Sequence, residues 1–183
     1  MLIYLLRHGE TDWNKEKRLQ GREDVPLNAT GIQQAHNATV MFDDIHLDLI
    51  LTSPLSRAKV TAQIIADYTN TPVIVEPDLT ERDFGSLSAT IPSSGDIFRL
   101  TDETDDVEPV EHVADRIIEV IRKYPLNSSI LLVSHGGAIN SVLVRAAGKV
   151  VGPGRTRLKN TCLSCLEYDG ESFNVLFYNR TAE

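Results

Sequence analysis

The chain of 183 residues has only two cysteines and no apolar run that approaches the length of a membrane span. The apolar stretch before Arg7 is also too short for the core of a signal peptide. Basic residues are in deficit, since the formal net charge is -8, which argues against a general surface for nucleic acid or anionic membranes. We therefore expect a cytoplasmic protein that binds neither nucleic acid nor membranes.

The two cysteines, Cys162 and Cys165, form a C-x-x-C pattern, which can indicate half of a zinc site or a redox pair. They lie in a stretch typical of a β-strand, where this spacing places the two side chains on opposite faces. No second pair of Cys or His follows nearby to complete a metal site. The prediction is two reduced thiols, at least one of them buried, with no metal and no cofactor.

What the chain does contain is a regular alternation of apolar and amphipathic segments. Strands are predicted at residues 1–7, 47–53, 72–77 and 128–135, and helices at residues 28–44, 54–69, 110–124 and 136–148. Two more strands flank Asp169-Gly170, a hairpin signal. This order predicts a single domain over residues 1–183, a three-layer α/β/α sandwich whose mostly parallel sheet has an antiparallel edge. An exposed edge strand near the C-terminus leaves a homodimer open.

Two of the predicted helices have recognisable start signals. Thr30, with Gln33 three residues later, has the capping-box pattern. Ser53 before Pro54 predicts an N-cap followed by the first helical residue. These signals predict that Thr30 and Pro54 open their helices.

Residues 86–109 break the alternation, because they are polar, acidic and weakly patterned. From Asp96 to Glu108, six acidic residues accompany a single basic residue, Arg99. The segment could be a solvated connection. It could also be a cap-like insertion over a site, since long irregular excursions in compact domains are often functional.

Ionisable or strongly polar groups follow four predicted strands, at the end where open α/β sheets bind ligands. In chain order these groups are Arg7-His8, Ser53 with Arg57, Glu81, and His135-Gly136-Gly137. Each has a structural explanation on its own, such as a hydrogen-bonded histidine or a surface ion pair between Glu81 and Arg82. Because the carboxyl ends of parallel strands meet at one edge, we expect these groups to lie together.

Together these groups suit a phosphoryl group. Two guanidiniums match its oxygens, and Gly136-Gly137 at a helix start would offer backbone N–H groups as a phosphate cradle. Neighbouring cations lower the pKa of an imidazole, which leaves a ring nitrogen free to act as a nucleophile. The chain has no P-loop, no HExxH and no convincing cluster of metal ligands. The prediction is metal-independent phosphoryl transfer.

Four segments in order, LRHGETDWN, SPLSRAKVTA, LTERDFG and LLVSHGG, resemble the histidine phosphatase superfamily, the phosphoglycerate mutase-like proteins. The resemblance runs from residue 2 to about residue 168. It implies that His8 is phosphorylated during turnover and that Glu81 donates a proton. The resemblance also implies phosphoryl-binding residues, namely Arg7, Arg57, His135, Asn14, Gln20 and Gly21.

The family includes both mutases and phosphatases. This chain is short for a phosphoglycerate mutase and lacks a basic cluster within residues 86–109 to hold a second phosphate. We therefore predict a phosphomonoesterase that acts on a small phosphorylated metabolite and releases inorganic phosphate. Mutase-type transfer and a non-catalytic phospho-ligand binder remain alternatives, although a binder would be expected to lose His8 or Glu81. Leu87-Ser88-Ala89 and Val107-Glu108-Pro109 depart from the family's usual Leu-Glu-Gly and Gly-Glu-Ser, which leaves the substrate open.

Overall fold

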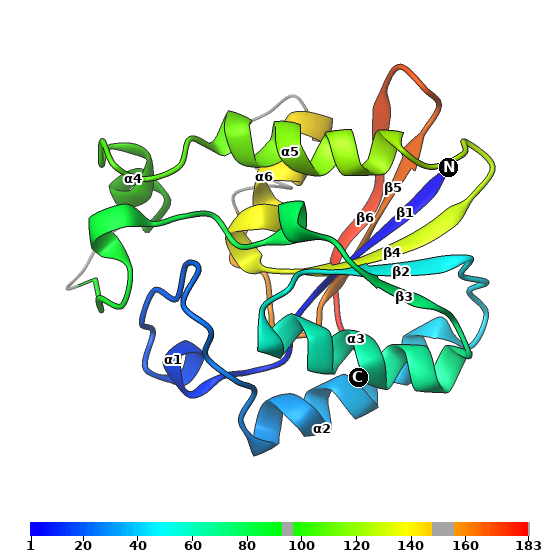
Figure 1. The fold of residues 1–183 in the computed structure, drawn as a ribbon, viewed down its shortest axis with the longest axis horizontal. Coiled ribbons are helices and arrows are strands. Elements are labelled where there is room, and N and C mark those ends of the chain that lie inside the picture. The colour runs from blue at the N-terminus through cyan, green and yellow to red at the C-terminus, as the bar shows by residue number, and fades with distance from the viewer. Residues whose placement is uncertain (93–96, 148–155, 183) are drawn as a thin grey trace.

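The computed structural model describes residues 1–92, 97–147 and 156–182. Its centre is a six-stranded sheet with the order β3-β2-β4-β1-β5-β6, and helices cover both faces (Figure 1). β1 to β4 pair in parallel, whereas β5 pairs antiparallel with both β1 and β6. The predicted α/β/α sandwich with an antiparallel edge is therefore confirmed. The strands are β1 (Leu2–Arg7), β2 (Leu49–Thr52), β3 (Val73–Val75), β4 (Ser129–Ser134), β5 (Leu163–Tyr168) and β6 (Phe173–Arg180).

Two long helices lie on each face of the sheet (Figure 1). They are α2 (Ala29–Ala38) and α3 (Ser56–Thr69) on one face, and α5 (Val110–Arg122) and α6 (Gly136–Ala147) on the other. Shorter helices complete the fold: α1 (Asp12–Lys15), η1 (Thr39–Phe42), η2 (Pro77–Leu79), η3 (Gly85–Leu87) and α4 (Ile97–Asp102). No helix within the described residues is long and apolar enough to cross a membrane.

β1 is apolar without alternation because both of its faces are buried. Ile3 and Leu5 pack into the apolar cluster under α5 and α6, and Tyr4 and Leu6 pack into the cluster under α2 and α3. Burial of each such side chain stabilises the fold by about 1.5–3 kcal/mol. This packing makes β1 a rigid support for the residues that follow it.

The parallel register brings the carboxyl ends of β1, β2 and β4 together. Arg7 at the end of β1 lies opposite Ser134 at the end of β4, and Thr52 at the end of β2 lies opposite Val133. The segments that begin with His8, Ser53 and His135 therefore leave the sheet side by side. The predicted meeting of these strand ends at one rim is confirmed.

The two predicted helix starts are wrong in detail. The N-cap of α2 is Asn28, not Thr30, because the Asn28 side chain accepts a hydrogen bond from the backbone N–H of Gly31. α3 begins at Ser56 rather than at Pro54. The hydroxyl of Ser53 instead contacts Nε2 of His135, 2.8 Å away, and accepts a bond from the N–H of Leu55.

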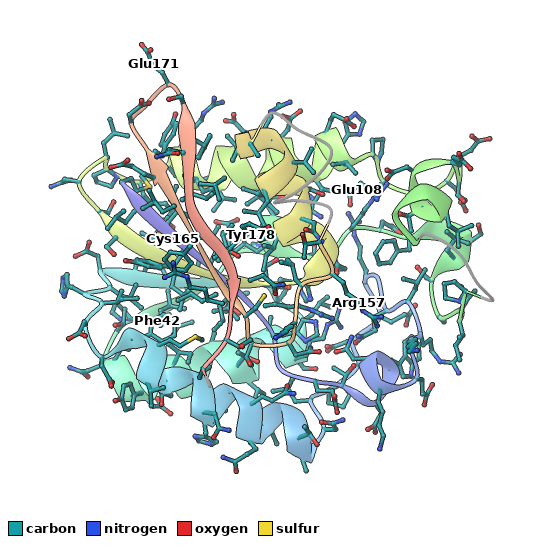
Figure 2. The ribbon with its side chains drawn as sticks, turned by 180° about the vertical axis from the view of Figure 1, so that it is seen from behind. Phe42, Glu108, Arg157, Cys165, Glu171 and Tyr178 are labelled. Carbon is teal, nitrogen blue, oxygen red and sulfur yellow. The ribbon has the colours of Figure 1, made fainter. Side chains whose placement is uncertain are left out.

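The two cysteines lie on opposite sides of the sheet, as their spacing predicts. Cys162 packs into the cluster under α5 and α6, and Cys165 packs into the other cluster together with Phe42 (Figure 2). Both are buried and unbonded to one another, and burial raises the pKa of each thiol to about 11. They are core residues. The predicted hairpin is also present, and Glu171 marks its tip (Figure 2).

Residues 86–109 are more regular than their sequence suggests. The segment contains the end of η3 and all of α4, so the expectation of irregular structure is wrong for residues 97–102. Residues 93–96 lie outside the described part of the chain. Arg82 holds the segment to the body of the protein, because its guanidinium donates to the side chain of Asp102 and to the backbone carbonyl of Glu108.

Candidate active site

A pocket of about 730 Å³ opens at the rim where the parallel strands end. Of the nine residues predicted for the site, Gly21 and His135 are not on its wall, and both contact Arg57 instead. The seven that line the pocket are Arg7, His8, Asn14, Gln20, Arg57, Glu81 and Gly136. The structure therefore places most of the residues predicted for the site around one cavity.

His8 is buried, with 2% of its surface exposed. Its Nδ1 atom lies 2.6 Å from the carbonyl oxygen of Gly9. Because a carbonyl oxygen only accepts, Nδ1 carries the ring proton and Nε2 keeps a free lone pair. Burial, followed by the charges of Arg7 and Arg57, lowers the pKa of His8 well below its ordinary value. The ring is therefore neutral at pH 7, with Nε2 available as a nucleophile.

Gly9 is required by the backbone of α2. A Cβ atom at Gly9 would lie 2.3 Å from the carbonyl oxygen of Gly31, and a Cβ at Gly31 would lie 2.1 Å from that of Glu10. The two glycines thus let the segment after β1 pass directly over the start of α2. The N–H of Gly9 also donates to the Thr61 hydroxyl. These contacts fix the backbone that carries His8.

Arg57 is a fully buried cation held by neutral acceptors. Its guanidinium donates to the carbonyl oxygens of Gly21 and Glu23, at 2.9 and 2.6 Å, and to Nδ1 of His135 at 3.2 Å. Burial is the main cause that lowers the pKa of Arg57 to about 10. The group therefore stays charged at pH 7. Gly21 contributes to the site through its carbonyl, which orients this cation.

Arg7 presents an unused donor at the same rim. One of its terminal nitrogens donates to the Leu158 carbonyl, but its Nε is buried without a hydrogen-bond partner. Among the described residues, neither Arg7 nor Arg57 forms an ion pair with a carboxylate. A half-buried guanidinium and a fully buried one, neither paired with a carboxylate of the described residues, make a strong anion site in a chain of net charge -8.

His135 lies behind the pocket wall, and both of its ring nitrogens are engaged. Nδ1 accepts from Arg57, so in the neutral ring Nε2 carries the proton and donates to the Ser53 hydroxyl. Burial, then the charges of Arg57, His8 and Arg7, lower its pKa well below the ordinary value. Its ring centre is 5.2 Å from that of His8. In this arrangement His135 orients Arg57.

Glu81 is buried and fixed by the first turn of α6. Its Oε1 accepts from the N–H groups of Arg82 and Ala138, both at 2.8 Å, and its Oε2 accepts from the N–H of Gly137 at 3.1 Å. The N–H of Gly137 is therefore not free to cradle phosphate, and that expectation is wrong for this residue. Oε2 accepts only one of these bonds, which leaves it room to carry a transferable proton.

We expect Gly137→Ala to lower kcat about 10- to 100-fold, because small displacements of a reacting group have effects of this size. The added Cβ would lie 2.7 Å from Oε1 of Glu81, so the carboxyl group must move. Alanine is the better helix former by about 1 kcal/mol, so urea unfolding should show unchanged or higher stability. Wild-type kcat, or a loss of activity that merely follows a loss of stability, would contradict this role.

Asn14 and Gln20 line the pocket, and their side-chain amides differ in their hydrogen bonds. The Asn14 side-chain oxygen accepts from the N–H of Thr11 and from Nδ2 of Asn160, both at 3.1 Å. Its own amide nitrogen remains to donate to a ligand. Gln20 is 7% exposed, and its Oε1 is buried without a partner. The Asn14 amide nitrogen can therefore donate to a bound group.

Several supporting residues escape a reading of the sequence. Asn160 donates to the carbonyl of His8, 152 positions away, and no local pattern indicates this contact. Glu108 accepts from Arg116 at 3.0 Å and from Arg22 at 3.2 Å. Arg82 is as buried as Glu81, so their reading as a surface ion pair is wrong. Ser53, in contrast, is among the residues expected at the rim, because it is a polar residue that directly follows a buried strand.

Residues that could hold a metal ion are not grouped in the described ranges. Within 1–92, 97–147 and 156–182, no three His, Cys, Asp or Glu side chains are placed to ligate one ion. The groups that line the pocket around His8 include the cations Arg7 and Arg57, and the His8 imidazole is neutral. Their chemistry suits an anion.

Comparison with known proteins agrees with this geometry. The family profile described as "Histidine phosphatase superfamily (branch 1)" matches residues 3–181. Over 182 residues the chain is 39% identical to "Uncharacterized phosphatase PhoE" of Bacillus subtilis (strain 168), covering 97% of this chain and 93% of the relative. It is 35% identical to "Probable phosphoglycerate mutase GpmB" of Enterobacter sp. (strain 638), covering 91% and 84%. The solved alpha-ribazole phosphatase from Shigella flexneri is similar, with a TM-score of 0.80 and 27% identity over 98% of this chain and 96% of that one.

Proposed function

The chain belongs to branch 1 of the histidine phosphatase superfamily, and we propose that it hydrolyses small phosphomonoesters through a phosphohistidine formed on His8. One observation carries the proposal. A neutral imidazole with a free Nε2 lies in a pocket beside two guanidiniums that pair with no carboxylate in the described part of the chain. This arrangement binds a phosphoryl group and attacks it without a metal ion.

In the first step Nε2 of His8 attacks phosphorus as the bond to the ester oxygen breaks. Arg7 and Arg57 hold the other phosphoryl oxygens while negative charge spreads over them. Glu81, protonated on Oε2, gives this proton to the leaving oxygen. The products of the step are a free alcohol and phosphorylated His8.

In the second step water attacks phosphorus and the bond to Nε2 of His8 breaks. Glu81, now ionised, takes a proton from the attacking water, which restores its acid form. Inorganic phosphate leaves, and His8 returns to its neutral tautomer because Gly9 still accepts from Nδ1. Asn14, Gln20, Gly136 and His135 support the bound phosphoryl group, His135 through its contact with Arg57.

Phosphatase activity is better supported than mutase activity. A mutase must hold a second phosphate or carboxylate opposite the first, whereas the pocket wall formed by α4 and the start of α5 carries the acidic residues Asp102, Asp105 and Glu111. The similarity to a protein named as a probable phosphoglycerate mutase keeps phosphoryl transfer to a second alcohol as the alternative. His8 and Glu81 together in one pocket favour an enzyme over a binder.

The proposal is tested by hydrolysis of p-nitrophenyl phosphate after dialysis against EDTA. We expect the same kcat with EDTA as with added Mg²⁺, because cationic side chains perform the role of a metal ion. Activity that EDTA abolishes and a divalent metal restores would overturn the metal-free mechanism. Measurable phosphate binding without hydrolysis would support a binder instead. Transfer of phosphate to an added alcohol in preference to water would support a mutase.

A further inference from the structure

The pocket is much larger than a phosphate group, and its walls differ in charge. The cations Arg7, Arg57 and Arg157 line the pocket, as do Lys17 and Arg18, which follow α1. Arg157 lies on the segment that leads into β5 (Figure 2). Together with Asn14 of α1, these cations form one side of the pocket, and the phosphate would bind there.

The other side carries the carboxylates of Asp105 and Glu111, beside an ion pair of Arg82 with Asp102. Glu111 lies in the first turn of α5, and Asp105 lies between α4 and α5. α4 and α1 lie at the same end of the molecule and are separated from one another (Figure 1). Asp105 and Glu111 are exposed and form no ion pair with the described residues. This side would repel a carboxylate or a second phosphate on the substrate.

Asn140 on α6 adds an independent sign of a ligand. Its Nδ2 donates to the Thr156 carbonyl at 3.2 Å, which fixes the orientation of the amide. Its Oδ1 is then buried in the pocket wall, where no donor of the described residues reaches it, and only 8% of the residue is exposed. A buried acceptor without a donor is unfavourable until a ligand supplies one. A ligand that brings a hydrogen-bond donor to this oxygen would satisfy it.

Asn140 lines the same pocket as the cations and the carboxylates. Through Thr156 it touches the segment of Arg157, and its helix packs against α5, which carries Glu111. A neutral hydroxyl would satisfy Asn140 alone. A primary ammonium would satisfy Asn140 and would also be attracted by Asp105 and Glu111.

We infer that the preferred substrate is the phosphate monoester of an amino alcohol, with its phosphate between Arg7 and Arg57 and its ammonium group at Asn140. The inference rests on the phosphatase function proposed above. It names Asn140 as a specificity-determining residue and the carboxylates of Asp105 and Glu111 as its electrostatic support. It also predicts that esters bearing a carboxylate at the same position are poor substrates.

The test compares esters that differ only at the far end of the alcohol. At two chain lengths, 2-aminoethyl and 4-aminobutyl phosphate are compared with the apolar isosteres propyl and pentyl phosphate and with the matching carboxylate esters. We expect kcat/KM for the amine to exceed that of its isostere about tenfold at one or both lengths, as expected when a site hydrogen-bonds a substrate NH and attracts its charge. The carboxylate esters should be the poorest.

Substitutions test whether these residues cause the preference for the amine. Asn140→Leu should reduce the amine-to-isostere ratio of kcat/KM about tenfold, and Asn37→Leu, an exposed helical position on α2, should leave it unchanged. The double variant Asp105→Asn, Glu111→Gln changes only exposed charges, so the enzyme should stay folded. It should reduce the amine-to-isostere ratio of kcat/KM about threefold. Equal kcat/KM for amine and isostere at both lengths would overturn the inference, as would a preference for the carboxylate. Failure to hydrolyse any ester, p-nitrophenyl phosphate included, would instead refute the proposed phosphatase function.

Discussion

Replacing His8 by alanine is expected to lower kcat for p-nitrophenyl phosphate by about 10⁴-fold or more, the order seen when a catalytic nucleophile is removed. The reason is geometric: the protein directs one unprotonated imidazole nitrogen into the anion pocket, and alanine has no atom to replace it. Acid-labile phosphate on the denatured protein should disappear as well. Phosphate binding should persist, because Arg7 and Arg57 are unchanged.

The measurement combines steady-state kinetics, thermal unfolding and trapping of the phosphoenzyme in alkaline denaturant followed by acid treatment. His36→Ala is the matched control, since His36 is exposed on α2 and should keep both activity and the acid-labile phosphate. A folded His8→Ala variant that retains a tenth of the wild-type kcat would exclude a phosphohistidine at this position. Phosphate that stays on the variant protein would point to another nucleophile.

Replacing Glu81 by glutamine is expected to lower kcat for alkyl phosphates about 10²- to 10⁴-fold, the usual contribution of general acid–base catalysis. Glutamine keeps the size and the acceptor oxygen of the side chain, so the bonds from the N–H groups of Ala138 and Arg82 can persist. It cannot give a proton to the leaving oxygen. An alkoxide needs this proton, whereas p-nitrophenolate leaves without it.

The two substrates should therefore respond differently to this substitution. With p-nitrophenyl phosphate the variant should release a burst of p-nitrophenol equal to the enzyme present, and then turn over slowly because Glu81 no longer activates water. Glu119→Gln serves as the control, as Glu119 is exposed on α5. The same loss for both esters in the absence of a burst would mean that Glu81 acts on structure rather than on proton transfer.

Much of the fold could be predicted because its determinants are local in the chain. The continuous apolar run of β1 indicates a strand buried on both faces, and the amphipathic pattern of α5 indicates a helix with one buried side. The alternation of such elements then predicts the parallel sheet, and parallel pairing predicts that residues after β1, β2 and β4 meet.

The two errors at helix starts have different causes. Thr30 has a capping signal, but Asn28 is the residue that reaches the N–H of Gly31. Ser53 has the composition of an N-cap, but its hydroxyl contacts His135, which comes from another strand end. The first error is a choice between two capping residues two positions apart, since asparagine is also a favoured N-cap. In the second, a contact with a residue distant in the sequence replaced the one that propensity favoured.

The sequence by itself determined which chemical groups reach the rim, because the order of strands and helices decides which residues follow each strand. Only the tertiary structure decided how those groups are used. It selected the tautomer of His8 through Gly9, placed His135 behind Arg57, and assigned the N–H of Gly137 to Glu81. It also left the oxygen of Asn140 without a donor. Apart from the contact between the neighbours His8 and Gly9, these outcomes depend on distances of a few ångströms between residues far apart in the chain, and no local pattern encodes such distances.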